Sequence, residues 1–296
     1  MSKKVRNIVL LFTIALIWGL SFSAQRSGAS TLAPFTFYNF RNYFAVWTMS
    51  ILIIFNRKNI EISKKKESIK AGIILGVIDF LALAVQQIGI GYTTASKSSF
   101  ITATYVIMVP LFAAIFGKKI KKSLWLFVFL VIVGLYLLFV YDNFVINIGD
   151  IITFVGAFFF AIHILLIEKE GDKMDTLIFC FVQYIICAIL STICMLAFEM
   201  PIDVEGIKTS WFALAYTGIL SSAVCVTIQV FVQKEVDSTI ASLIMCLESV
   251  FGAFGGWLIL HEVLSTKQIL GCLLAFVAIV ISQLPDRKNH KMKIFS

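Results

Sequence analysis

The chain is dominated by apolar stretches that are each about as long as a membrane is thick. A helix rises about 1.5 Å per residue, so roughly 20 apolar residues cross a hydrocarbon core of about 30 Å. Between these stretches lie charged or turn-forming residues, for example Lys118 and Lys119 or Glu170, Gly171 and Asp172. We predict spans at residues 7–25, 34–55, 70–91, 96–117, 123–141, 148–168, 176–198, 209–232, 238–260 and 265–284.

Composition excludes the main alternatives to a membrane protein. Hydrophobic residues make up 59% of the 296 residues, whereas soluble domains contain roughly 45–50%. Charged residues reach only 14%, against about 25% in ordinary globular proteins. The first stretch follows Lys3, Lys4 and Arg6 and has some features of a secretory signal. We expect it to be retained as a helix, because nine further stretches follow it.

The placement of lysine and arginine predicts the orientation. With the N-terminus in the cytoplasm, the inner segments hold about twenty of these residues, and the outer segments hold only Arg26, Lys97, Lys208 and Lys267. Cytoplasmic loops retain positive charge during insertion. We therefore predict a multi-pass protein of the cytoplasmic membrane with both termini inside. The net charge of +8 follows from this topology and requires no nucleic-acid partner.

The two halves of the chain are weakly similar. Residues 101–117 align without gaps on residues 240–256, with Phe112 matching Phe251. Five spans in each half would place the halves in opposite orientations, an arrangement common in secondary transporters. The predicted fold is therefore an all-α membrane protein with ten transmembrane helices in two inverted five-helix repeats. The first repeat covers residues 1–144, the second covers 145–286, and a basic cytoplasmic tail covers 287–296.

Several local patterns follow one another in the order and spacing of a known family. Trp18-Gly19 precedes Ser21-Phe22 in the first span, and Arg41 lies in the second. Further patterns are the run from Tyr92 to Ile101 with Pro110, Leu247-Glu248-Ser249-Val250-Phe251, and the closing stretch from Gly271 to Ile281. Together they resemble the EamA family of the drug/metabolite transporter superfamily. His261-Glu262 departs from the Gly-Glu that this family often has, and Ser249 replaces a frequent proline.

The resemblance implies a ten-span carrier made of two five-helix repeats. Members of the family transport amino acids, metabolites, nucleotide-like compounds and drugs, so the resemblance implies transport without naming a cargo. Asp79 does not belong to the family pattern.

Four acidic or basic side chains lie deep inside predicted spans, where a charge costs about 2.5–3.5 kcal/mol and therefore makes them functional candidates. Asp79 and Glu248 lie near the midplane, Arg41 is nearer the outer face and His163 is nearer the inner face. Both carboxyls are candidates for cargo or proton binding, with a structural hydrogen bond as the alternative. Asp79 is also a potential partner of Arg41, whose planar guanidinium suits a carboxylate or phosphate. For His163, a hydrogen bond between helices is favoured over a proton relay.

Other polar and aromatic residues are weaker candidates for the binding site. Lys97 lies at an outer helix end, where reaching toward the membrane surface is the favoured role. Gln87 and Gln183 suit either cargo binding or hydrogen bonding between helices. Trp18 is a candidate for an aromatic wall, although most aromatic residues in such a chain face lipid or pack against other helices.

Proline and glycine predict two structural features. Pro110 removes a backbone hydrogen bond in the fourth span and should kink it. Gly252 and Gly256 form a small-residue face that permits close helix contact, with a homodimer contact as the less favoured use. No metal or other cofactor is expected, because the six cysteines lie in predicted spans without a metal-binding spacing.

These features favour a secondary carrier that moves a small organic solute, either an amino acid or a related metabolite, by alternating access, with export as the favoured direction. No phosphate-binding glycine loop is present, so a solute or ion gradient would supply the energy. A passive channel or membrane scaffold is the alternative. An intramembrane enzyme is the least favoured class, because His261-Glu262 begins a zinc motif whose second histidine is missing.

Overall fold

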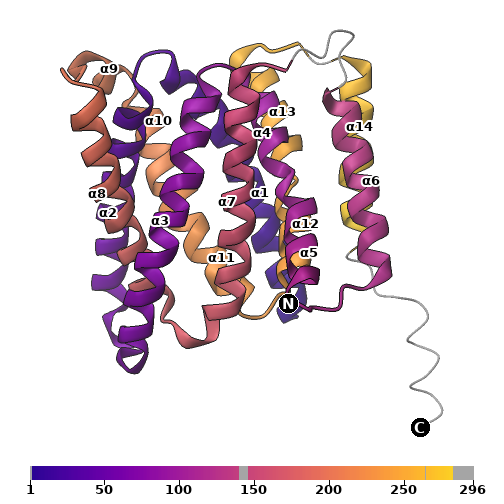
Figure 1. Ribbon diagram of the computed structural model, residues 1–296, viewed down its shortest axis with the longest axis horizontal. Helices are drawn as coiled ribbons and strands as arrows, with labels where there is room; N and C mark the ends of the chain where they lie inside the picture. Colours follow the sequence, from indigo (N-terminus) through magenta and orange to yellow (C-terminus); the bar gives the residue numbers. More distant parts are fainter. Residues whose placement is uncertain (1, 140–145, 264, 283–296) are drawn as a thin grey trace.

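The computed structural model describes residues 2–139, 146–263 and 265–282, and every regular element within them is a helix. Most helices run side by side along one direction (Figure 1). They are α1 (Lys3–Ala29), α2 (Pro34–Asn56), α3 (Lys65–Ile90), α4 (Ala95–Ala103), α5 (Tyr105–Ile115), α6 (Lys122–Phe139), α7 (Ile148–Glu170), α8 (Thr176–Phe198), α9 (Val204–Thr209), α10 (Trp211–Ala215), the π-helix η4 (Tyr216–Val224), α11 (Cys225–Gln233), α12 (Ser238–Met245), α13 (Glu248–Leu260) and α14 (Thr266–Ser282). Short 3₁₀ turns lie at Arg57–Asn59, Ile62–Lys64 and Gly171–Lys173.

Among the described residues, seven helical segments are long and apolar enough to cross a membrane. They are Lys3–Ala29, Ile62–Ile90, Ala95–Ile115, Ile148–Lys173, Thr176–Phe198, Trp211–Gln233 and Ser238–Leu260. Two shorter apolar helices cover Lys122–Gly134 and Thr266–Ser282. Helix α2 is long enough but is not among the seven, because Asn39, Arg41 and Asn42 lower its hydropathy. The prediction of a helical, multi-pass membrane protein is confirmed for the described residues.

Parts of the predicted organisation lie outside the described residues. These are the repeat boundary at 144–145, the ends of the spans at 123–141 and 265–284, and the tail at 287–296.

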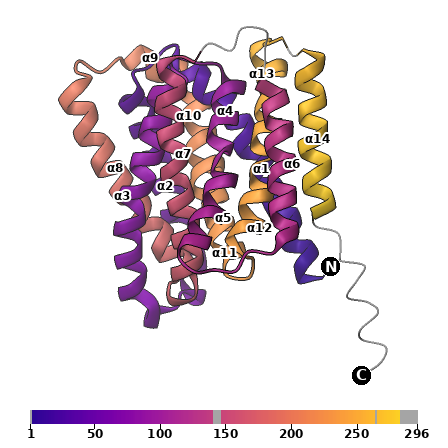
Figure 2. The same cartoon turned by 45° about the vertical axis from the view of Figure 1, so that its right-hand side comes forward.

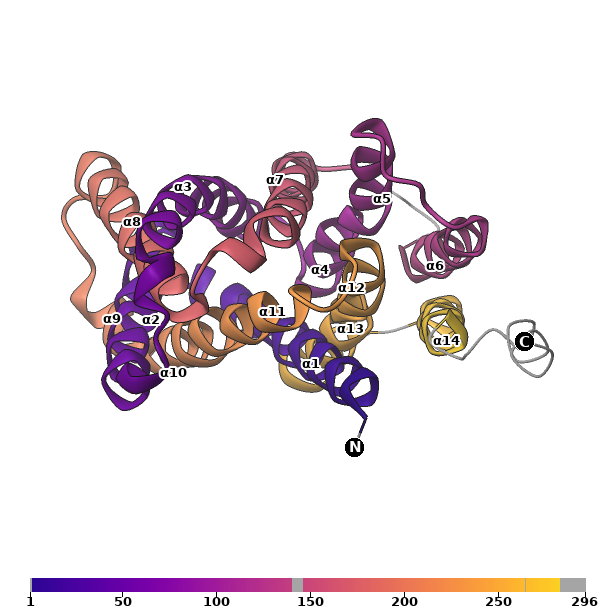
Figure 3. The ribbon, with the colours of Figure 1, turned by 90° about the horizontal axis from the view of Figure 1, so that it is seen from below.

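The bundle joins helices that are distant in sequence. Helix α3 packs against α7 and α8, while the later segment α10–α11 packs against α1 and α2. Helix α1 also packs along α13. Helices α6 and α14 pair with each other at one side of the bundle (Figures 2 and 3). This packing places the middles of α1, α2, α3 and α7 around the centre of the molecule.

Two of the predicted spans are interrupted at their middles. The span predicted at 96–117 consists of α4 and α5, which meet at Thr104, and the span at 238–260 consists of α12 and α13, which meet at Cys246 and Leu247. The Thr104 hydroxyl donates to the Ile101 carbonyl oxygen at 2.6 Å, and the Cys246 thiol donates to that of Leu243 at 3.0 Å. Such bonds to the preceding turn compete with the helix ladder and bend helices.

The break in the first of these spans is not at its proline. Pro110 lies inside α5, which continues past it, whereas the interruption at Thr104 comes before it. The position of Pro110 therefore does not mark the irregular backbone that borders the central cavity.

A third irregularity is the π-helix η4, which covers nine residues between α10 and α11. π-Helical turns are rare and occur frequently at functional sites. Here the π-helix approaches α2 closely at Gly218, where a Cβ atom would come within 2.5 Å of the Arg41 carbonyl oxygen. This close approach brings the next turn of η4 to the Arg41 side chain.

Small residues bring α13 against its neighbours. A Cβ atom on Gly252 would overlap the Ser99 side chain of α4, and one on Gly256 would overlap Ser96 and Glu262. The face formed by Gly252 and Gly256 is therefore occupied within the chain by α4, which leaves it unavailable for a homodimer contact.

Carboxylates from distant segments cap two helices. Glu199 accepts hydrogen bonds from the backbone N–H groups of Phe35 and Thr36 at 2.8 and 2.6 Å, at the start of α2. Glu262 accepts from those of Ala95 and Ser96 at 3.1 and 3.3 Å, at the start of α4. Amides at a helix start have no partner within the helix, and an acidic group there is also favoured by the helix dipole.

Candidate functional site

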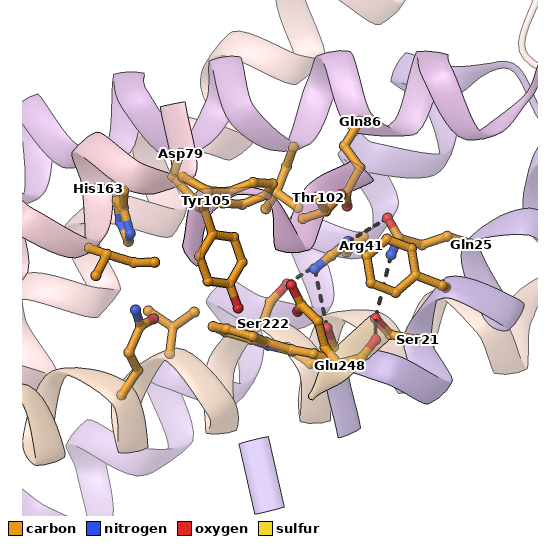
Figure 4. Close-up of a pocket in the computed structure, with 18 of the residues that line it drawn as sticks. Ser21, Gln25, Arg41, Asp79, Gln86, Thr102, Tyr105, His163, Ser222 and Glu248 are labelled. Carbon is orange, nitrogen blue, oxygen red and sulfur yellow. Dashed lines mark hydrogen bonds between the residues drawn. The ribbon is translucent and has the colours of Figure 1, made fainter. Parts of the chain in front are cut away.

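A cavity lies at the centre of the bundle, among α1, α2, α3, α7, α8 and the three irregular segments (Figure 4). About 570 Å³ of space inside this cavity, including any part that is open to solvent, is not filled by atoms. Its lining residues are Trp18, Ser21, Phe22, Gln25, Arg41, Asp79, Leu83, Gln86, Thr102, Tyr105, Phe160, His163, Ile164, Tyr184, Ser221, Ser222, Val226, Gln229 and Glu248.

The irregular segments supply several of the polar lining groups. Thr102 and Tyr105 flank the junction of α4 and α5, and Glu248 begins α13. Ser221 and Ser222 come from the π-helix. Irregular backbone inside a membrane is tolerated where it is buried in protein or lines a cavity, and transporters use it at binding sites.

Arg41 is a buried cation held only by neutral groups. Its side chain donates to Ser222 Oγ at 2.8 Å, to Gln25 Oε1 at 3.2 Å and to Ser221 Oγ at 3.4 Å. Among the described residues, no carboxylate oxygen lies within 4.0 Å of its nitrogens. Since buried charges are normally paired, Arg41 is a candidate for binding an anionic group from outside the chain.

The π-helix orients this cation. The indole Nε1–H of Trp18 donates to the Ser221 carbonyl oxygen at 2.8 Å, which ties α1 to the same turn that holds Arg41. The Tyr216 hydroxyl donates to the Ile17 carbonyl oxygen at 3.0 Å, one turn earlier in η4. Trp18 therefore contributes both to the cavity wall and to the position of Ser221.

Glu248 is a buried carboxylate without a cation. Among the residues that the structure describes, its Oε1 atom has no hydrogen-bond partner, and the same holds for the hydroxyl groups of Tyr105 and Tyr184, which line the same cavity. Each such atom costs free energy unless a ligand or water completes its hydrogen bonds. Arg41 and Glu248 thus present a guanidinium and a carboxyl group to the same space, neither with a charged partner among the described residues.

Asp79 belongs to a second polar group in the cavity wall. Its Oδ2 atom accepts hydrogen bonds from Gln183 Nε2 at 3.2 Å and from Cys187 Sγ at 3.6 Å. Gln183 Oε1 lies 3.1 Å from His163 Nε2. Since the Gln183 amide nitrogen faces Asp79, its oxygen is left to accept the proton of His163 Nε2.

The structure brings together most of the residues that the sequence singles out. Trp18, Arg41, Asp79, His163 and Glu248 all line the cavity. Their binding roles remain predictions. The hypothesis that Asp79 pairs with Arg41 is wrong, because Asp79 bonds to Gln183 and Cys187 instead.

The remaining predicted residues lie outside the lining. Gln183 stands behind Asp79, and Gln87 donates to the Gln25 carbonyl oxygen at 3.4 Å. Lys97 forms an ion pair with Asp150 at 2.5 Å, between the start of α4 and the start of α7.

Sequence inspection overlooks several lining residues. Ser21, Gln25, Thr102, Ser221 and Ser222 are uncharged and common in membrane helices, so nothing in the sequence separates them from packing residues. No group of three or more His, Cys, Asp or Glu side chains suited to a metal occurs among the described residues.

Comparison with known proteins agrees with this architecture. The model of the EamA-like transporter family matches residues 5–140 and again residues 147–283. A crystal structure of a protein with 13% sequence identity superposes with a TM-score of 0.76, over 94% of this chain and 96% of that one, and so shares the fold.

Curated relatives carry transporter names. An "uncharacterized transporter" of Archaeoglobus fulgidus is 28% identical over 93% of this chain and 84% of its own length. The "uncharacterized transporter YoaV" of Bacillus subtilis is 23% identical over 91% and 94%. An "S-adenosylmethionine/S-adenosylhomocysteine transporter" of Chlamydia trachomatis is 25% identical over 86% and 82%. With two copies of the family model covering nearly all of its length, the chain belongs to the EamA-like transporter family.

Proposed function

We propose that the protein is a secondary carrier of the cytoplasmic membrane that moves a small zwitterionic solute, an amino acid or a related metabolite, by alternating access. The observation that carries the proposal is the central cavity, in which Arg41 and Glu248 are buried without charged partners. A zwitterion supplies both missing charges, with its carboxylate at Arg41 and its ammonium group at Glu248. Carriers of this type move cargo down its gradient, so export follows where the cytoplasmic concentration is the higher one.

We propose further that ten spans form two inverted five-helix repeats. The packing supports this, because α3 contacts α7 and α8 just as the segment α10–α11 contacts α1 and α2. The two interrupted segments also share landmarks: Thr94 and Asp237 cap their starts, and Gly117 and His261, both with positive φ, follow their ends. When the two segments are aligned on these landmarks, the alignment is shifted by about one helical turn relative to the gapless sequence match.

The distribution of charge supports the proposed orientation. The start of α1 lies at the lower end in Figure 1, together with the lysine-rich segments after α2 and α5. We assign this end to the cytoplasm, because positive residues are retained there.

The relative named for S-adenosylmethionine and S-adenosylhomocysteine supports the cargo class. Both compounds contain an amino-acid head group with a free carboxylate and a free ammonium group. We propose that the same head group is recognised in this chain.

Counterflow in proteoliposomes tests the carrier proposal. Vesicles with the full-length protein are loaded with a mixture of unlabelled L-amino acids, or with S-adenosylmethionine, and diluted into a labelled trace of the same compound. A carrier produces a transient, saturable accumulation of label above equilibrium. A channel only equilibrates the label without overshoot, and such a result, or no flux of any probe, would refute the proposal.

A further inference from the structure

The cavity carries its charged groups at two separate places. In Figure 4, Asp79 and His163 lie at one end, Arg41, Gln25 and Ser21 lie at the other, and the Tyr105 ring stands between them. A compact amino acid that binds Arg41 and Glu248 leaves the Asp79 end without a contact. The cavity is therefore built for a cargo with a further functional group at some distance from its head group.

Asp79 differs from most of the buried carboxylates. Asp150 is paired with Lys97, while Asp175 accepts hydrogen bonds from the N–H groups of Glu61, Leu177 and Ile178 at 3.0 Å each. Asp79 is only 3% exposed and has no cation within 4.0 Å among the described residues. Its Oδ1 atom makes no hydrogen bond to any described residue, and its side chain lines the cavity.

The lining holds more carboxyl groups than permanently charged basic groups. Asp79 and Glu248 are two carboxyls, while Arg41 is the one lining group with a permanent positive charge. His163 uses Nε2 for its hydrogen bond with Gln183 Oε1. When both carboxyls are ionised and His163 is uncharged, the lining has one surplus negative charge, which a cationic cargo would neutralise.

The groups around Asp79 favour an organic cation over a metal ion. Hard cations such as Na⁺ or Mg²⁺ need several oxygen ligands. Gln183 instead presents its amide nitrogen and Cys187 its thiol, while the Gln183 oxygen is occupied by His163. Tyr38 of α2 and Tyr184 of α8 also face Asp79, and Arg41 interacts with it electrostatically from the other end of the cavity. Oδ1 is left to accept a hydrogen bond or an ion pair from the cavity.

We propose that Asp79 forms a second cargo subsite, which binds a positively charged group at the distal end of an amino-acid cargo. This subsite rests on the proposed function, because it assumes that Arg41 and Glu248 hold the head group. A cargo with a carboxylate, an α-ammonium group and a distal cation then meets Arg41, Glu248 and Asp79, respectively. Lysine, ornithine, arginine and sulfonium amino acids belong to this class, and each has the net positive charge that the ionised cavity lacks.

Matched pairs of cargo provide the test. L-Lysine and L-norleucine have the same carbon chain and differ in the distal ammonium group, and S-methylmethionine and methionine differ in the sulfonium charge. Each compound competes with labelled S-methylmethionine for binding to the purified full-length protein. The ammonium group of lysine can donate a hydrogen bond to Asp79, and the sulfonium group can form an ion pair with it, so the charged member of each pair should bind at least about tenfold more tightly.

Two variants test whether Asp79 is responsible for the tighter binding of the charged compounds. In Asp79→Asn, the ratio of the affinity for lysine to the affinity for norleucine should fall to about one. In Glu248→Gln, both affinities should fall together and the ratio should persist, because both compounds carry the α-ammonium group. Size-exclusion chromatography verifies that each variant is folded, and the ratios in the wild-type protein require no variant at all.

The outcomes separate this subsite from the proposed function. Equal binding of lysine and norleucine by the wild-type protein, or an unchanged ratio in Asp79→Asn, would overturn the subsite while leaving amino-acid transport intact. If none of the four compounds binds, both the head-group assignment and the subsite are wrong. If Na⁺ protects the protein against unfolding and Asp79→Asn removes that protection, the Asp79 end holds a metal ion and the proposal fails.

Discussion

Arg41 shows how a single side chain determines what the cavity accepts. The guanidinium presents a planar set of donors that Ser221, Ser222 and Gln25 fix in direction. A lysine at this position keeps the charge but loses the two-pronged geometry that matches a carboxylate.

We therefore expect Arg41→Gln to weaken the binding of amino-acid cargo by about thirtyfold or more, since removing one partner of a buried charged pair costs about 2–5 kcal/mol. The affinity of Arg41→Lys for the cargo should lie between that of Arg41→Gln and that of the wild-type protein. The measurement is competition binding, with the methyl ester of the same amino acid as the control. The ester has no carboxylate, so its weak binding should change little between proteins. An equal loss for acid and ester would show that Arg41 acts on the fold instead.

The sequence reveals the site residues only where their chemistry is unusual for a membrane. Arg41, Asp79, His163 and Glu248 are conspicuous because ionisable groups are costly inside a span. Ser221, Ser222 and Thr102 are not conspicuous, because a hydroxyl can donate its hydrogen bond to a backbone carbonyl in the preceding turn of its own helix. Their place at the cavity follows from packing between distant helices, which one sequence does not display.

At the scale of elements, the same limit applies to the interruptions. The junctions at Thr104 and at Cys246-Leu247 contain neither proline nor glycine, and the π-helix has an ordinary composition. Propensity therefore predicts continuous helices for all three segments. The presence of these helices could be predicted from hydropathy, but the two interruptions and the π-helix that border the cavity could not.

The segment after α5 illustrates how charges hold two elements together. Lys118 contacts Glu168 at the end of α7 and Asp237 at the start of α12, each at 2.7 Å. Burial alone would raise the pKa of Asp237, but hydrogen bonds from Lys118 and Thr239 outweigh it and hold that pKa below its usual range. For Lys118, burial opposes the charge, and the hydrogen bonds to Asp237 and Glu168 raise its pKa above the ordinary value.

These shifts predict a pH-dependent contribution to stability. The lowered pKa of Asp237 stabilises the folded state above the unfolded value of about 3.9, and this contribution disappears as pH falls through the folded pKa. Asp237→Asn should therefore lower the thermal stability in detergent near neutral pH, by about 1 kcal/mol or less since the pair is partly exposed. The difference from the wild-type protein should shrink below about pH 4. Glu205→Gln removes an exposed pair with Lys208 and serves as the control, with little expected change. A difference that stays constant with pH would contradict the electrostatic explanation.

At the scale of the whole molecule, length, hydropathy and charge placement were sufficient to predict a helical, multi-pass membrane protein. The span predicted at 34–55 corresponds to α2, which lies within the bundle even though its polar residues lower its hydropathy. One property of the bundle came only from the structure. Helices α6 and α14 pair with each other at the side, away from the cavity.

The proposed topology predicts which surface reagents can reach. Cysteines introduced at Lys208 and Lys119 should react differently with a membrane-impermeant maleimide in intact cells, since we place the first outside and the second in the cytoplasm. Lys208→Cys should label at once, and Lys119→Cys only after permeabilisation. The wild-type protein gives the background, because four of its six cysteines are buried and the other two are only partly exposed. Labelling of both positions in intact cells would contradict the assignment of the two ends of the bundle to opposite sides of the membrane.

The unequal charges of the cavity have a consequence for the membrane potential. In the proposed cycle, with Asp79 and Glu248 ionised and His163 uncharged, the loaded cavity is neutral and the empty one carries one surplus negative charge. The potential therefore acts on the return of the empty carrier, by up to about 2.3 kcal/mol per 100 mV for a charge that crosses the whole field. An interior-negative potential favours the outward-facing empty carrier, which assists uptake of a cationic amino acid and opposes its export. Net export must then draw on a cargo gradient steep enough to exceed that electrical work.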